Sequence, residues 1–288
     1  MNGLLVIDKP GGVTSRDAVN RVQKWFPKGT KIGHTGTLDP LATGVLVVCV
    51  GAATRLADYV QAMGKSYASR FRLGATSTTD DADGAVTETP NATPPTREQI
   101  DAALAAFIGN VEQMPPAFSA LKVGGRRAHD LARQGKDVVL AARAVRIDAV
   151  RVRAYEWPWF DVEVDCGKGT YIRSIARDLG AALGCGGLVQ TLRRTRVGPF
   201  KAEQGVSIDA DPASVKLRPM AEAVAGMAQV RVTADEVKRL RQGQRVRSHQ
   251  ELAIADGMEL VVLDEQGEVV GVALFEQGHL KPHIVFAK

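Results

Sequence analysis

The chain has 288 residues, of which 45% are hydrophobic and 24% are charged, as expected for a globular protein with a buried core. Its net charge of +5 is modest, so binding to a polyanion depends on where the cations lie. Three widely spaced cysteines without a CxxC pair predict neither a disulfide framework nor a zinc site. We expect a cytoplasmic protein without a membrane anchor, because the apolar start, Leu4–Ile7, is too short for a signal peptide or a membrane span.

The first third of the chain predicts short buried strands joined by tight turns. Residues 3–8 read as a strand that ends at Lys9-Pro10, and Ser15 is expected to cap the helix that follows. Residues 45–50 form a β-branched run typical of a buried strand, with a helix near 52–60. From Tyr67 to Leu73 apolar and polar residues alternate, which predicts a strand with one buried face.

The middle of the chain contains a basic stretch between predicted regular elements. A helix is expected over residues 97–108, and residues 115–145 then carry many cations with little strand pattern. These cations are Lys122, Arg126, Arg127, Arg133, Lys136 and Arg143. Such a stretch is often a solvated face, but it would also serve as a flap over a phosphate backbone. Further strands are expected at 145–154, 160–166 and 189–197, with a helix near 171–183.

The last quarter of the chain differs in composition. Residues 209–228 are rich in Ala and Pro and poor in β-forming residues, so we expect a linker there. The tail then predicts a compact β-rich unit with strands near 252–254, 260–263, 269–274 and 284–286. We therefore expect two domains, at residues 1–228 and 229–288.

Asp39 is the candidate catalytic residue. It lies in a loop rich in glycine and threonine, directly before the buried strand, and Pro40 pushes it into an extended conformation. A carboxylate held on a stiff loop at the end of a core strand suits a nucleophile or a general base. Alone, however, the Asp-Pro pair is more typical of a simple turn.

Four other residues are weaker candidates on pattern alone. Tyr171 and Arg173 lie where a strand leads into a helix, and Arg173 there either pairs with Asp39 or meets phosphate or solvent. Tyr67 and Leu192 would ordinarily be core residues. No phosphate loop, calcium loop or dinucleotide fingerprint has the required spacing, so no metal, nucleotide or redox cofactor is expected.

Residues 33–44, Gly-His-Thr-Gly-Thr-Leu-Asp-Pro-Leu-Ala-Thr-Gly, resemble the catalytic motif of the tRNA pseudouridine synthases of the bacterial TruB family. The resemblance extends over about residues 1–200 in order. Its further segments are 8–12, 65–67, 79–84, 119–122, 132–135, 168–173, 179–180 and 192–194. It implies a mixed α/β catalytic domain around a largely antiparallel sheet. The tail would match a small β-rich PUA-like domain that binds RNA.

The resemblance also implies a role for each matching residue. Asp39 would be the essential nucleophile, paired with Arg173. Tyr67 would stack on the target uracil, and Tyr171 and Leu192 would line the base pocket.

The remaining matches lie around the catalytic loop. His34 would enter the space that the flipped nucleotide leaves in the RNA. Lys9 and Pro10 would support the loop.

The implied reaction is isomerisation of uridine to pseudouridine at position 55 in the T-loop of tRNA, by a monomer without protein partners. Asp39 would attack ribose C1′, attack uracil C6 or take the C2′ proton; the sequence leaves all three open. Arg126, Arg127, Arg193 and Arg194 are expected to contact phosphates of the T-arm. Two alternatives are a non-catalytic RNA-binding or RNA-folding protein and a guide-dependent synthase subunit acting on ribosomal RNA.

Overall fold

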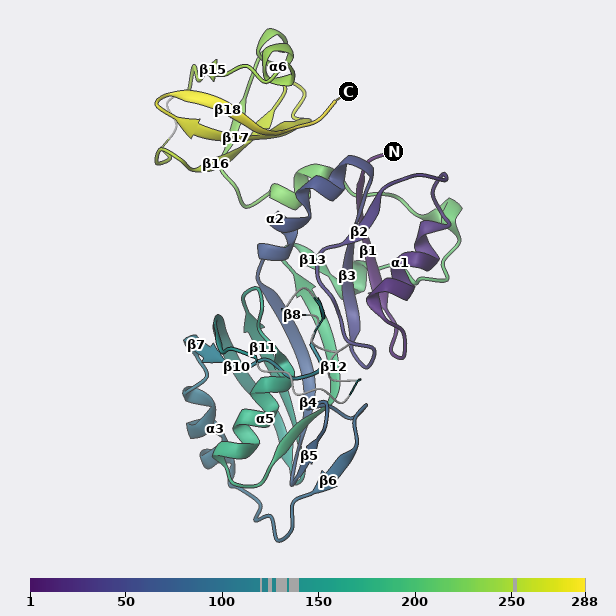
Figure 1. Ribbon diagram of the computed structural model, residues 1–288, viewed down its shortest axis with the longest axis vertical. Coiled ribbons are helices and arrows are strands. Elements are labelled where there is room, and N and C mark those ends of the chain that lie inside the picture. The colour runs from purple at the N-terminus through teal and green to yellow at the C-terminus, as the bar shows by residue number, and fades with distance from the viewer. Residues whose placement is uncertain (120, 124–125, 128–133, 135–139, 251–252, 288) are drawn as a thin grey trace.

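The computed structural model describes residues 1–287 apart from five gaps, at 120, 124–125, 128–133, 135–139 and 251–252. A nine-stranded sheet forms the centre of the molecule (Figure 1). Its strands are β1 (Gly3–Lys9), β2 (Ile32–His34), β3 (Thr43–Val50), β4 (Lys65–Leu73), β7 (Gly109–Gln113), β10 (Arg143–Glu156), β11 (Trp159–Cys166), β12 (Gly187–Val197) and β13 (Phe200–Lys201).

The strands follow the order β1-β3-β12-β4-β11-β10-β7, with β2 added beside β3 and β13 beside β12. Every pair is antiparallel except β3 with β12, which run parallel over the short register Thr43–Arg193 and Gly44–Arg194. The expected mixed α/β fold on a largely antiparallel sheet is confirmed. Because β3 carries the Asp39 loop and β4 carries Tyr67, this parallel junction brings the two halves of the sheet together.

Helices α3 (Arg97–Ala105) and α5 (Ile172–Ala182) cover one face of the β4–β11–β10 half of the sheet (Figure 1). The alternation expected in β4 is confirmed, because Tyr67, Ser69, Phe71 and Leu73 are all buried. Phe71 also packs edge to face against Phe160 of β11, with ring centroids 5.1 Å apart. This apolar layer forms the floor below the end of α5 that carries Tyr171 and Arg173.

Strands β1 and β3 are buried on both faces, which explains why their sequences are continuous apolar runs. One face packs against α1 (Ser15–Gln23), and the other against η1 (Gly51–Leu56) and α2 (Ala57–Ala62). The buried strand expected at 45–50 is confirmed. The helix expected near 52–60 begins instead as the 3₁₀ turn η1.

The expected cap of α1 is wrong by one residue. Thr14 is the N-cap: its hydroxyl accepts a hydrogen bond from the Asp17 amide, and the Asp17 carboxylate accepts one from the Thr14 amide. Ser15 is the first residue of the helix and is 2% exposed. Its hydroxyl binds the peptide groups of Leu38, directly before Asp39, so tertiary contacts decide its role.

Residues 209–228 are not a free linker. The segment contains the short turns η3 (Pro212–Ser214) and η4 (Met220–Val224). Leu4 and Arg218 exchange two backbone hydrogen bonds, of 2.9 and 2.8 Å. Ala223 and Val224 are buried in the same cluster as β1 and β3. The composition was correctly read as poor in strand, but it did not show that these small residues fill the core.

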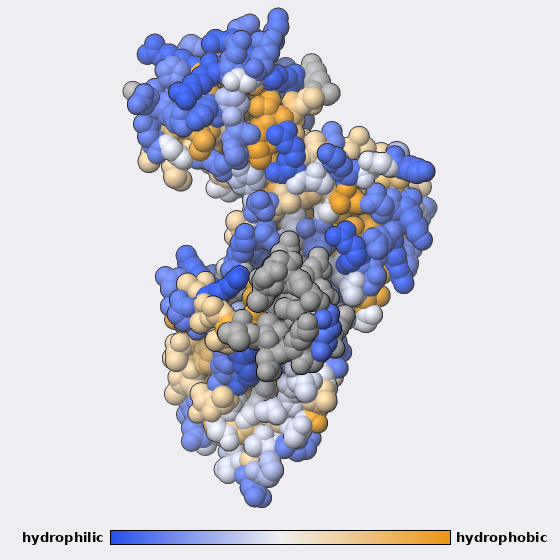
Figure 2. All heavy atoms as spheres, in the orientation of Figure 1, coloured by the Kyte–Doolittle hydropathy of each residue, from blue (hydrophilic) through white to orange (hydrophobic). Residues whose placement is uncertain are grey.

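The chain ends in a five-stranded sheet with the order β14-β16-β17-β18-β15, seen above the large sheet in Figure 1. Its elements are β14 (Gln229–Arg231), α6 (Ala234–Arg241), β15 (Val246–Arg247), β16 (Glu259–Leu263), β17 (Val269–Glu276) and β18 (His279–Val285). Helix α6 was not expected from the sequence. In the view of Figure 2 the surface of this unit is mostly hydrophilic.

The five-stranded unit packs against α2 and η1. Tyr59 donates a hydrogen bond to Glu259 at 2.9 Å, and Arg55 donates to the Val285 carbonyl at 2.6 Å. Of the strands expected in the tail, 260–263 and 269–274 are confirmed, and the last runs over 279–285. Residues 253–254 are not in a strand, and Leu252 lies outside the described residues.

The chain also contains the small strand pairs β5 (Ala75–Ser77) with β6 (Val86–Glu88), and β8 (Lys122–Val123) with β9 (Arg126–Arg127). A further 3₁₀ turn, η2 (Ala202–Gln204), follows β13. Across the described part of the chain, no helix has both the length and the apolar character needed to cross a membrane.

Candidate active site

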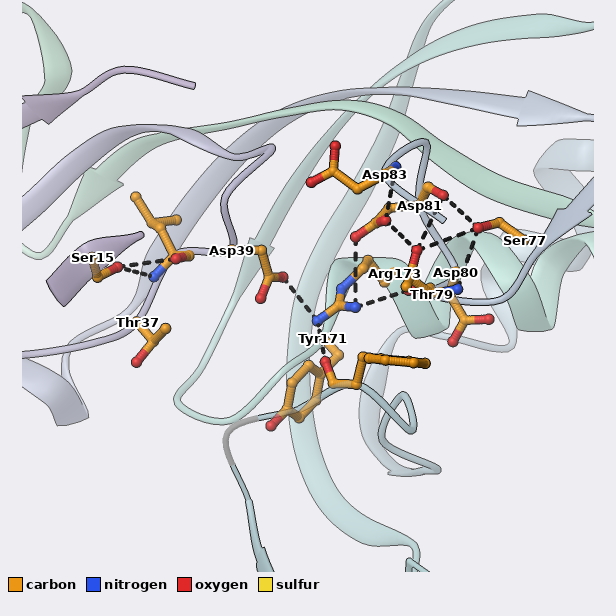
Figure 3. Close-up of polar contacts among 12 residues, drawn as sticks. Ser15, Thr37, Asp39, Ser77, Thr79, Asp80, Asp81, Asp83, Tyr171 and Arg173 are labelled. Atoms are coloured by element: carbon orange, nitrogen blue, oxygen red, sulfur yellow. Dashed lines mark hydrogen bonds and ion pairs between the residues drawn. The ribbon is translucent and has the colours of Figure 1, made fainter. Parts of the chain in front are cut away.

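The loop carrying Asp39 is fixed from the α1 side by Ser15. The Ser15 hydroxyl accepts a hydrogen bond from the Leu38 amide at 2.8 Å and donates one to the Leu38 carbonyl at 3.0 Å. Figure 3 shows this pair of contacts one residue before Asp39. Because both peptide groups of a buried residue are engaged, the backbone that enters Asp39 has little freedom.

Lys9 fixes the loop from the other side. Its side chain is fully buried, and Nζ donates to the carbonyls of Pro10 and Val13 at 2.8 Å each and of Pro40 at 3.4 Å. Burial lowers the Lys9 pKa to about 8, although the nearby Asp39 charge acts in the opposite direction. Pro10 itself is exposed and contributes its carbonyl. The ammonium group thus ties the end of β1 to the residue that follows Asp39.

Arg194 lies beneath the same loop, and the expectation that it contacts phosphate is wrong. Its residue is 3% exposed, and its guanidinium donates to the carbonyls of Val45 at 2.8 Å and Gly36 at 3.1 Å. Gly44 lets the backbone of β12 lie close to the start of β3: its φ is +99°, and a Cβ there would lie 2.2 Å from the Arg194 carbonyl oxygen. A buried arginine that holds loop carbonyls is structural.

Arg193, its neighbour, points to the opposite face of β12. Its guanidinium donates to both carboxylate oxygens of Asp8, at 2.9 and 2.8 Å. The Arg193 side chain is still 41% exposed in this bidentate pair, so the phosphate contact expected from the sequence stays a prediction. Of the other two expected phosphate ligands, Arg126 and Arg127, only the backbone is described, in β9. The expected flap residues Arg133 and Lys136 lie outside the described residues.

Arg173 is the centre of the polar network at the site, on the first turn of α5. Its Nη2 lies 2.9 Å from Asp39 Oδ2 and donates to the Phe118 carbonyl at 3.0 Å. Its Nη1 donates to the Thr79 carbonyl at 2.8 Å and lies 3.5 Å from Asp81 Oδ2 (Figure 3). The Arg173 side chain is 4% exposed, whereas that of Asp39 is 35% exposed. A buried cation therefore orients a carboxylate that solvent, or a substrate, can reach.

Asp81 is a residue of the site that sequence analysis missed. It lies in the turn after β5 and is 3% exposed; Oδ1 accepts hydrogen bonds from the Thr79 hydroxyl at 2.5 Å and the Asp83 amide at 3.2 Å. Burial raises the Asp81 pKa, and the Thr79 hydrogen bond and the Arg173 charge oppose that rise. The sequence signal was slight, since two other aspartates lie within two positions of it.

The two tyrosines flank Asp39 from different elements. Tyr67, on β4, is 7% exposed; burial raises its pKa, Arg194 opposes this, and Asp39 adds to it. Tyr171 precedes α5 and is half-buried; burial raises its pKa, a hydrogen bond with Ser119 opposes this, and Asp39 again adds to it. Both hydroxyl groups are thus within electrostatic range of the carboxylate.

The remaining candidates lie at the margins of this group. Leu192 is 7% exposed and shares an apolar cluster with Tyr67 and Ile172. His34 is half-buried at the end of β2, where its backbone pairs with Val48 of β3. Within the described residues, no three His, Cys, Asp or Glu side chains are grouped so as to hold a metal ion.

Together these residues form one partly exposed carboxylate fixed by a buried guanidinium, near two tyrosines and an apolar cluster. The rigid loop presents Asp39 without freedom to swing away. This arrangement suits attack on, or proton removal from, a nucleoside held against the tyrosines.

Family models match three consecutive parts of the chain. They are the TruB family pseudouridylate synthase N-terminal domain over residues 24–172, the tRNA pseudouridylate synthase B C-terminal domain over 173–211, and the pseudouridine synthase II TruB C-terminal domain over 228–286. The tRNA pseudouridine synthase B of Ruegeria pomeroyi is 42% identical over all of this chain and 96% of its own. That of a Mycobacterium species (strain KMS) is 52% identical over 72% of this chain and 71% of its own.

Solved structures show the same fold at lower identity. A chain in an H/ACA RNP bound to a substrate RNA containing 2′-deoxyuridine is 23% identical and has a TM-score of 0.75, with 99% of this chain and 85% of that chain covered. A chain in a Cbf5-Nop10-Gar1 complex is 24% identical with the same TM-score, with 99% and 84% covered. These two likenesses concern the fold alone. The family models and the identity to full-length relatives establish that this chain belongs to the TruB family of pseudouridylate synthases.

Proposed function

We propose that this enzyme isomerises uridine to pseudouridine at position 55 in the T-loop of tRNA, with Asp39 as the nucleophile. The observation that supports it most is the Asp39–Arg173 pair, in which a half-exposed carboxylate is oriented by a buried guanidinium. The relatives named tRNA pseudouridine synthase B support tRNA as the substrate. A tRNA substrate also supports a cytoplasmic location, which is part of the proposal.

The reaction is a rearrangement without a net change of atoms. The bond from ribose C1′ to uracil N1 breaks, the uracil turns, and C1′ bonds to C5; the C5 proton leaves and N1 gains a proton. A carboxylate serves this chemistry by attacking C1′ or C6 or by removing the C2′ proton. In all three routes Arg173 holds Asp39 Oδ2, so the carboxylate stays aimed while the base turns.

The aromatic and apolar residues would hold the base during that turn. A uracil inside an RNA fold must first leave its stack, which costs a few kcal/mol. Stacking on Tyr67, with Tyr171 and Leu192 lining the pocket, would offset part of this cost. His34, at the start of the same loop, would fill the space left in the RNA.

The proposal is tested by incubating the purified protein with an unmodified tRNA transcript and mapping pseudouridine. We expect product at position 55 with wild-type protein and none with Asp39→Asn, which keeps the shape of the side chain but not its charge. Affinity for tRNA should change less than threefold or so, because phosphate contacts dominate RNA binding. Asp101→Asn, an equal change on exposed α3, is the matched control and should leave product formation unchanged. Product formation by Asp39→Asn at the wild-type rate would remove the nucleophile assignment.

We further propose that the protein acts as a monomer without protein partners. The H/ACA RNP and Cbf5-Nop10-Gar1 structures show the same fold in assemblies, so this point needs its own test. Turnover of a naked transcript by the isolated chain supports stand-alone action. An inactive isolated chain that gains activity only with a guide RNA or added proteins would favour the guide-dependent alternative.

A further inference from the structure

Gln113 connects the edge of the large sheet to the chain that carries Tyr171. It is the last residue of β7, where its backbone pairs with Arg143 of β10, and it is 4% exposed. Its side-chain Oε1 accepts a hydrogen bond from the Tyr171 amide at 2.8 Å, and its Nε2 donates to the Tyr171 carbonyl at 3.1 Å. One buried carboxamide thus binds both peptide groups of a single residue, as a paired strand would.

This contact is needed because Tyr171 is a poor start for a helix. Tyr171 is the N-cap of α5, and its side chain makes no capping hydrogen bond. The first amides of a helix require partners from elsewhere, and Tyr lacks the short acceptor that Ser, Thr, Asp and Asn provide. Gln113 does not replace that acceptor, which would bind the amides two or three residues further on. Its Oε1 accepts from the amide of Tyr171 itself, as the Glu or Gln of a capping box does, and so holds the N-cap residue from outside the helix.

The segment after Gln113 is joined to the same turn of α5. The Met114 carbonyl accepts hydrogen bonds from the Ser174 hydroxyl and from Arg177 Nη2, each at 2.8 Å. The Phe118 carbonyl accepts one from Arg173 Nη2 at 3.0 Å. Between them Pro115 and Pro116, both buried, restrict the backbone. Gln113 is therefore the sheet-side end of a stiff connection that reaches Arg173.

We propose that Gln113 is a positioning residue for the isomerase reaction: by binding both peptide groups of Tyr171 it fixes the start of α5, and with it the Tyr171 ring and the Arg173 guanidinium at Asp39. The inference rests on the proposed function. Gln113 itself touches neither Asp39 nor any group to which a role in the chemistry is assigned. Its effect passes through the backbone of Tyr171 and the first turn of α5.

The test uses Gln113→Glu, which changes one NH₂ group to an oxygen. An ionised carboxylate still accepts from the Tyr171 amide but repels its carbonyl, whereas a protonated carboxyl donates to that carbonyl and restores both bonds. Burial and the facing carbonyl favour the protonated form, which raises the pKa of the introduced group above its ordinary value of about 4.3. The variant should therefore be impaired at pH 8 and recover as the pH falls towards 6.

Single-turnover rates on tRNA transcript are measured from pH 5.5 to 8.5 and expressed relative to wild type at each pH. We expect about a 10- to 100-fold loss for Gln113→Glu at pH 8, the scale of a misplacement of roughly 1 Å, with most of it regained at pH 6. Gln113→Ala should be impaired at every pH, without recovery. The Kd for tRNA should stay within about twofold of wild type for both, because phosphates dominate binding.

Two controls separate positioning from folding. Gln99→Glu makes the same change in the exposed capping box of α3, where a carboxylate also accepts from the Thr96 amide, and should leave rate and pH profile unchanged. Thermal unfolding at pH 6 and pH 8 fixes an assay temperature at which every variant is folded. Rates of both Gln113 variants within twofold of wild type would overturn the inference. So would a loss in Gln113→Glu that does not reverse at low pH. A wild-type protein that makes no pseudouridine would instead refute the proposed function.

Discussion

Arginine–carboxylate pairs occur in two regions of this protein with opposite character. At the site, Arg173 and Asp81 have side chains only 4% and 5% exposed, and the two Nη groups of the guanidinium meet four acceptors. On the sheet face opposite α3 and α5, Arg151 pairs with Asp165 at 2.8 Å, with side chains 49% and 28% exposed. The buried network determines a geometry, whereas water competes with the exposed pair. Arginine–carboxylate pairs thus fix a geometry where they are buried and contribute little where they are exposed.

The exposed pairs form a ladder across three strands. Its members are Arg70–Asp161, Arg151–Asp165 and Arg153–Glu163, which join β4 to β11 and β10 to β11. The acidic residues alternate along β11 with residues of the apolar core. Charged pairs of this kind are typical of the solvent-facing side of an antiparallel sheet. The apolar residues of β11 and the helices α3 and α5 lie on the other face. Four substitutions test this difference between buried and exposed charges.

Arg173→Lys should have the largest effect. One ammonium cannot reach Asp39, Asp81 and two carbonyls at once, so buried groups lose their partner. We expect at least a hundredfold or so lower rate of pseudouridine formation and a loss of about 3 kcal/mol in unfolding free energy. Single-turnover kinetics and urea unfolding measure both. The exposed Arg70→Lys is the control; a rate for Arg173→Lys within threefold of wild type would contradict the comparison.

Asp81→Asn should have an intermediate effect. The amide keeps the size of the side chain but removes the charge that faces Arg173 Nη1, so Asp39 becomes the remaining anion on that guanidinium. We expect a rate about tenfold lower and a stability loss of about 1–2 kcal/mol. Asp83→Asn, two residues away and exposed, contributes only its backbone amide to the network and should behave as wild type. Equal rates for the two variants would show that Asp81 does not act on the site.

Lys9→Met should change how the unfolding free energy depends on pH, because it removes a buried ammonium group. The folded-state pKa of Lys9, about 8, lies below the unfolded value of 10.5, so the folded protein binds fewer protons between these values. The contribution of Lys9 to unfolding free energy therefore rises with pH across that window. Wild-type stability minus variant stability should grow by about 2 kcal/mol from pH 7.5 to 9.5. Exposed Lys28→Met is the control, for which this difference should stay flat in urea unfolding.

Arg151→Gln should have the smallest effect. Its pair with Asp165 is open to water, and Asp165 keeps Ser66 and Arg196 as partners. We expect no change in rate and a change in stability of about 0.5 kcal/mol or less. Added salt should leave the variant and wild type equally stable. A loss comparable with that of Asp81→Asn would erase the distinction between the two regions.

Local patterns in the sequence predicted the long strands of the large sheet, but not short ones such as β2, β6 and β7. The alternation in β4 and the apolar runs of β1 and β3 reflect which faces are buried, because buried positions favour apolar residues. The sequence did not indicate α6, although Thr233 and Glu236 form a capping box there. With eight residues and one narrow apolar side, that helix depends on packing against the small sheet.

The site was less predictable than the fold because its contacts join distant segments. Arg193 and Arg194 look alike in the sequence, yet alternation on β12 sends one to Asp8 and buries the other beneath the catalytic loop. Asp81 and Gln113 have no distinguishing pattern, since their roles depend on Arg173 and Tyr171 arriving from another element. Such pairings require the register of the sheet, which no single segment specifies.

The parallel junction of β3 with β12 joins segments that are synthesised at different times. Asp39 is made early, but Arg173 and Arg194, which orient and support it, follow only after roughly 135 and 155 more residues, or about 7 to 31 seconds of synthesis at ordinary elongation rates. On that side of β3, β2 already pairs with residues 48–50, so it is the Thr43–Gly44 end that lacks its partner until β12 emerges. The contacts that orient and support Asp39 can therefore form only after about two thirds of the polypeptide has been synthesised.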